Sequence, residues 1–221
     1  MHKRNRVLSG ILSISVLTIT ALAPTALLGG QTTPKALAAG GISYDIGTPT
    51  VHDYWISPTG NNNNSGEQNS PIATIGHAWE LVPQGTTLQT GFRFHLLPGT
   101  YNSSDLWVEN RQGTANAPII FQGDGAPGSI VINGNLNSKD IHYTYFINLN
   151  YQYAHDLMHF ENADHILLRG VTLHSPSGAQ ETLKVNQTQY MYVEDSDISG
   201  AWDNAIDFVS VQYGHVVRSK I

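Results

Sequence analysis

The side chains of this chain best suited to chemistry are carboxylates gathered near its C-terminal end. They are Glu194, Asp195, Asp197, Asp203 and Asp207. A calcium ion in a protein takes roughly six to eight oxygen ligands and tolerates irregular geometry. A group of acids at this density can therefore supply a site for Ca²⁺.

The candidate ligand set is Glu181, Asp203, Asn204 and Asp207. The last three fall between a corner and the start of a strand, so their oxygens can converge, and Glu181 comes from the preceding coil. The alternative is an ordinary corner with a solvated face, because Asp and Asn bond their own backbone at turns and tolerate turn conformations. The sequence leaves both interpretations open.

The elements that must position these acids are short strands that repeat. Leu168, Val193 and Val216 fall in one column of the repeat, 25 and 23 residues apart. Within each unit the apolar residues are spaced as in a strand, and Gly, Asn, Asp and Ser occupy the corners. A strand-built period in the twenties predicts a solenoid of stacked coils.

The N-terminal residues 1–38 predict a secretion signal peptide. A basic stretch precedes an uncharged apolar segment over residues 7–28, and Ala36, Leu37 and Ala38 supply a small-residue cleavage site. The alternative is a membrane anchor, since a segment of this length can span a bilayer. Residues 39–50, rich in Gly and Thr, predict a flexible linker.

Removal of residues 1–38 leaves seven basic residues against seventeen acidic ones, a net charge of −10. Nucleic acids and anionic lipids need basic faces, so we expect neither as a partner, and no membrane association after signal cleavage. The chain has no cysteine, so no disulfide contributes to its stability.

Before the repeats, alternation predicts strands over residues 51–56 and 92–97. Ser70 and Pro71 suit the start of a helix, and an apolar face extends it over residues 71–82. This short helix would cap the open end of the first coil.

Residues 141–155 do not fit the period. They contain Tyr143, Tyr145, Tyr151 and Tyr153, which would share one face of an extended segment. Aromatic rings stack on sugars, so these four could form one wall of a carbohydrate-binding groove. The alternative is that they pack against the side of the solenoid.

Three segments carry a family resemblance: Tyr54–Gly60, Asn69–Ile75 and Leu97–Tyr101. In order and spacing they resemble the entry segment of secreted right-handed parallel β-helix proteins, many of which are polysaccharide lyases or related carbohydrate-active proteins. The resemblance implies an all-β, right-handed parallel β-helix with a short N-terminal capping helix over residues 51–221.

The stretch from Asp203 to Asp207 resembles the calcium motif of family-9-type pectate lyases, with Asn204 in place of the second Asp. This resemblance implies β-elimination on a uronic-acid polymer, in which calcium binds the sugar carboxylate and a lysine removes the neighbouring proton. The family places that base beyond Ile221. Neither Lys184 nor Lys220 matches its position, so the catalytic residues stay unknown.

We therefore expect a secreted, extracellular protein that binds or cleaves an acidic polysaccharide. The alternatives are a non-catalytic surface or adhesion module and a glycoside hydrolase, which needs a carboxylate pair flanking a groove. The strand that ends at Ile221 has no cap after it. We accordingly expect an N-terminal portion of a longer protein that is monomeric at full length.

Overall fold

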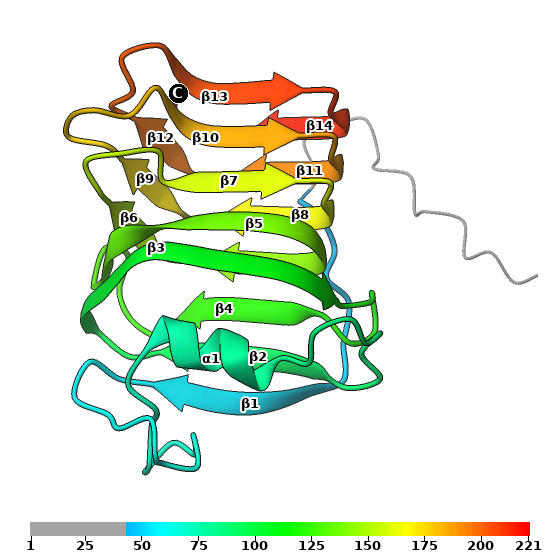
Figure 1. Cartoon of the computed structure of the whole chain (residues 1–221), viewed down its shortest axis with the longest axis vertical. Coiled ribbons are helices and arrows are strands. Elements are labelled where there is room, and N and C mark those ends of the chain that lie inside the picture. Colours follow the sequence, from blue (N-terminus) through cyan, green and yellow to red (C-terminus); the bar gives the residue numbers. More distant parts are fainter. Residues whose placement is uncertain (1–42) are drawn as a thin grey trace, which may run out of the picture. The chain divides into compact units, whose positions relative to one another are not determined.

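The computed structural model describes residues 43–221, and the predicted signal peptide lies outside the described residues. The strands stack coil on coil, with β1 near one end and β13 and β14 near the other (Figure 1). Every pairing between two of these strands is parallel. The predicted all-β parallel β-helix is confirmed.

The strands form three faces of the coil, each named here after one of its strands. The β10 face holds β7 (Met158–Glu161), β10 (Glu181–Asn186) and β13 (Asn204–Val209). The β11 face holds β1 (Val51–Ile56), β2 (Gly91–Leu96), β4 (Ile119–Gly123), β8 (Asp164–Arg169), β11 (Gln189–Glu194) and β14 (Gln212–Val217). The β12 face holds β6 (Asn150–Gln152), β9 (Thr172–His174) and β12 (Asp197–Ser199).

Two long strands turn corners without a break and belong to more than one face. They are β3 (Gly99–Gln112) and β5 (Ile130–Ile147). Residues 136–139 of β5 pair with β7 on the β10 face, and residues 144–147 pair with β8 on the β11 face. The segment that breaks the sequence period therefore remains part of the coil.

The corner after each strand of the β10 face uses one left-handed residue. Asn162, Gln187 and Ser210 follow β7, β10 and β13 and have φ angles of 51°, 50° and 58°. Polar side chains such as Asn tolerate this conformation better than β-branched ones do. These corners turn the chain while the strands on either side keep their inward residues in register.

The core is a stack of inward side chains that continues from coil to coil. The rings of Phe94, Phe121, Phe146 and Phe160 follow one another at centroid distances of 4.8, 5.8 and 6.0 Å. All four are buried. Stacking between coils therefore supplies the apolar burial that stabilises the fold.

The capping helix α1 (Ile75–Leu81) packs Trp79 onto this stack, 4.6 Å from the Phe121 ring. Thr74 is its N-cap and accepts a hydrogen bond from the His77 amide at 3.1 Å. The helix begins later than the predicted residue 71, because Ile72 forms a parallel bridge with Ile56 instead. Among residues 43–221 no helix is long and apolar enough to cross a bilayer.

Residues 43–50, called here the N-terminal strap, run along the outside of the β11 face (Figure 1). The Tyr44 amide donates to Glu194 Oε1 at 2.6 Å, and its ring stacks on Tyr192 at 4.4 Å. At the other end, the Thr50 amide donates to the Asn116 carbonyl at 2.8 Å. The sequence predicts a flexible linker over residues 39–50. Within the described part of that range, Tyr44 and Thr50 are instead held against the coils by these contacts.

Candidate functional site

The outward side of the β10 face carries two rows of mostly polar side chains, one residue from each coil. The first row is Trp107, Asn137, His159, Lys184 and Asp207. The second row is Glu109, Lys139, Glu161, Asn186 and Val209. The residues between the rows, such as Phe160 and Val185, are buried, because alternate residues of a strand point to opposite sides.

Both lysines of these rows are paired with carboxylates. Lys139 Nζ lies 2.9 Å from Glu161 Oε1 in the neighbouring coil, and this hydrogen bond raises the pKa of Lys139. Lys184 Nζ lies 3.3 Å from Glu181 Oε1 and 3.8 Å from Asp207 Oδ2. The face is therefore a surface of charge pairs and amides, with the exposed Trp107 ring at one end.

His159 lies in the middle of the first row and is half-buried. The Asn186 side-chain amide lies 3.1 Å from His159 Nε2 and donates to it. Burial lowers the pKa of His159 from its ordinary value of 6.5, and the nearby Lys184 acts in the same direction. The imidazole is therefore neutral at pH 7, with its proton on Nδ1 available for donation to a bound molecule.

This pKa shift predicts a pH dependence of stability. Below about pH 6.5 the unfolded chain protonates its histidine, whereas folded His159 takes up a proton only at a lower pH. The free energy of unfolding should fall as the pH drops from about 7.5 to 5. His159→Asn should make this fall shallower in urea titrations across that range. An identical slope in wild type and variant would contradict the assignment.

The predicted calcium ligands come from the edge of the same face. Glu181 is 4% exposed, and the backbone register places it beside Asn204 in the next coil. Asp203 and Asn204 are exposed. Asp207 is linked to Glu181 by Lys184, whose ammonium group lies near both carboxylates. Among residues 43–221 no group of three or more His, Cys, Asp or Glu side chains is arranged to hold a metal ion. As arranged, the four residues do not fit a calcium ion, because the Lys184 ammonium lies between two of them; calcium stays a prediction.

The other three acids of the sequence cluster lie elsewhere. Glu194 accepts from Arg169 Nε at 2.9 Å beneath the strap. The Arg218 guanidinium holds both oxygens of Asp195, at 2.6 and 2.8 Å, and lowers the pKa of that carboxyl. Asp197 is 3.0 Å from Lys220 Nζ. Each of these carboxylates thus has a cationic partner away from Glu181 and Asp207.

The four predicted sugar-stacking tyrosines do not share an exposed face, and that prediction is wrong. Tyr145 and Tyr151 are only 1% and 3% exposed, so neither ring can meet a sugar. The left-handed corner at Asn148 separates them onto different faces of the coil. Tyr143 stacks on His165 at 4.2 Å outside the β11 face, and Tyr153 contacts His155 at 5.5 Å. The alternative, packing against the solenoid, is confirmed for Tyr145 and Tyr151.

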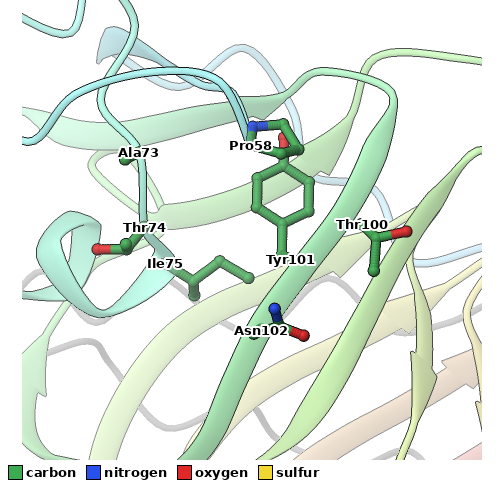
Figure 2. A pocket seen from close by; sticks show the side chains of 7 residues that line it. All are labelled: Pro58, Ala73, Thr74, Ile75, Thr100, Tyr101 and Asn102. Atoms are coloured by element: carbon green, nitrogen blue, oxygen red, sulfur yellow. The ribbon is translucent and has the colours of Figure 1, made fainter.

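Figure 2 shows a pocket beside the start of α1, which offers little chemistry. The Tyr101 hydroxyl lies 2.7 Å from the Leu97 carbonyl, and burial raises the pKa of this phenol. No charged side chain lines the pocket. Its lining residues are Pro58, Ala73, Thr74, Ile75, Thr100, Tyr101 and Asn102.

Comparison with known proteins gives similarity at the level of structure. The sequence matches no protein-family model and no curated protein. A solved rhamnogalacturonan lyase is similar over 72% of this chain and 50% of its own length, with a TM-score of 0.44 and 13% identity. The crystal structure of pectate lyase Pel9A is similar over 73% of this chain and 56% of its own, with a TM-score of 0.33 and 15% identity. The chain thus spans about half the length of both.

Proposed function

We propose that this protein is a secreted parallel β-helix that binds an extracellular polysaccharide along the outward side of the β10 face. The observation that supports this proposal is the pair of polar rows, which present one member per coil in backbone register. Neighbouring strands lie ~4.8 Å apart. A polymer laid across the coils would therefore meet one side chain of each row at every coil.

The chemistry of the rows suits a glycan. Asn137, Asn186 and His159 supply hydrogen-bonding groups for sugar hydroxyls. Trp107, 57% exposed, offers an indole face on which the apolar side of a sugar ring can stack. The lysines and carboxylates of the rows can bind further sugar hydroxyls. The lysine ammonium groups can also bind a sugar carboxylate.

The finer proposal is an acidic polymer cleaved by β-elimination. The names of the two similar structures refer to such polymers, rhamnogalacturonan and pectate. Elimination requires positive charge at the sugar carboxylate and a base for the neighbouring proton. The cationic side chains of this face that would supply that charge are Lys139 and Lys184.

Replacing Trp107 with alanine should weaken polysaccharide binding roughly tenfold, equivalent to about 1.4 kcal/mol, through loss of the stacking surface. Affinity electrophoresis in gels that contain polygalacturonate or a neutral galactan measures this effect. Trp202→Ala is the matched control, because Trp202 is also exposed but lies outside both rows. Equal retardation of wild type and Trp107→Ala, or no retardation in either polymer, would contradict the proposal.

Product analysis then separates the kinds of activity. A lyase produces the absorbance of unsaturated uronides from polygalacturonate. A glycoside hydrolase produces reducing ends without that absorbance. A non-catalytic binding module is retarded in the gel and produces neither.

A further inference from the structure

Lys184 occupies the place where the sequence predicts a metal ion. The β10–β13 register sets Lys184 beside Asp207 and Glu181 beside Asn204. The ammonium group lies 3.3 Å from a Glu181 oxygen and 3.8 Å from an Asp207 oxygen. It thus lies between two of the four predicted calcium ligands, which come from adjacent coils.

Glu181 explains why a cation is needed at this position. Its side chain is almost fully buried, and an unpaired carboxylate in that environment is strongly destabilising. Among the described residues, Lys184 is the cationic side chain paired with Glu181. The lysine is therefore a structural counter-charge for Glu181 as well as part of the outward row.

A calcium ion and this ammonium group exclude each other. Calcium binds carboxylate oxygens at about 2.3–2.6 Å. An ion held by Glu181 and Asp207 would lie within a few ångströms of Nζ, where repulsion between like charges is large. Calcium can bind only if the lysine side chain moves away and leaves its two partners.

We propose that Lys184 is a built-in cation that replaces a metal ion on the β10 face. Wild-type protein then binds no calcium there, and the Glu181 and Asp207 carboxylates can take up calcium only when Lys184 is removed. The inference concerns the same face as the proposed function. Only its relevance to polysaccharide binding rests on that function. Metal binding itself can be measured without a polysaccharide.

Isothermal titration of the protein with calcium chloride tests the inference. We expect no binding heat for wild type and a single site in Lys184→Met, with a dissociation constant of roughly 0.1–1 mM. Methionine keeps the apolar stem and removes the charge. Adding Asp207→Asn to Lys184→Met should abolish the site. Lys139→Met is the matched control, since it removes a paired lysine from the second row and should create no site.

Stability provides a second measurement. Lys184→Met leaves the Glu181 carboxylate unpaired, so its urea midpoint should fall below that of wild type. Calcium should raise the midpoint of the variant, or restore its folding if it is unfolded, and leave wild type unchanged. Failure of calcium to stabilise the variant would overturn the inference.

Calcium binding by wild type that Asp207→Asn removes would overturn it as well, and that result needs no lysine variant. None of these outcomes depends on a glycan. The gel assay, performed with a chelator and then with calcium, tests polysaccharide binding separately. A negative result there would contradict the proposed function and leave the inference about Lys184 standing.

Discussion

Replacing Arg169 with methionine should lower the free energy of unfolding by about 3–5 kcal/mol. The Arg169 guanidinium places Nε at 2.9 Å and Nη2 at 2.8 Å from Glu194 Oε2, and the Glu194 side chain is 1% exposed. Loss of the arginine would leave a buried carboxylate with the Tyr44 amide as its remaining strap partner. The expected loss of stability is large because the variant must keep an unpaired Glu194 carboxylate buried, which costs more than the loss of one contact.

Urea unfolding followed by circular dichroism measures this loss. Adding Glu194→Gln to Arg169→Met should recover part of the stability, since the uncompensated charge is then gone. Lys139→Met is the control: it breaks an ion pair at the surface, so it should change the free energy of unfolding far less than Arg169→Met does. If Arg169→Met has no greater effect than this control, the buried pair is not important for stability.

Replacing Phe121 with alanine should lower the free energy of unfolding by about 3–5 kcal/mol. Phe121 is buried between Phe94 and Phe146, and Trp79 of the capping helix packs on it at 4.6 Å. Removing the ring leaves a cavity at the junction between the helix and the coils. Tightly packed neighbours cannot close such a cavity completely.

The same urea titration, with tryptophan fluorescence added, tests this second expectation. Trp79 should change its emission in Phe121→Ala before the main transition, because its packing partner is missing. Trp107→Ala removes a larger but exposed ring and should change stability by about 0.5 kcal/mol or less. Equal stability of the two variants would contradict a continuous aromatic core.

The fold could be predicted from the sequence because inward positions repeat along the chain. Val193 pairs with both Leu168 and Val216 in the structure, as their shared column predicts. Local periodicity encodes which side of a strand is buried, and that information survives without knowledge of distant contacts. The start of α1 was mistaken because the Ile72 bridge to Ile56 competes with the helix for the same residues.

The candidate site was harder to predict for two physical reasons. The earlier coils differ in length, so the row members Trp107, Asn137 and His159 are separated by 30 and 22 residues, and the later offsets of 25 and 23 do not align them. Corners also redirect side chains: the left-handed Asp195 lies between Glu194 and Asp197 and sends them to different places. Acids that are close in sequence therefore lie apart in the structure. The ion pair between Lys184 and Asp207 joins two coils, so it depends on the register between their strands.

The N-terminal strap affects the order in which the molecule folds. Tyr44 contacts Glu194, 150 residues further along the chain, so the strap cannot bind there until strand β11 has joined the solenoid. Closing so long a loop is entropically costly and comes late in folding. A solenoid normally opens one coil at a time from an end. Here a segment that precedes the first coil is attached several coils away, so these coils should lose their structure together.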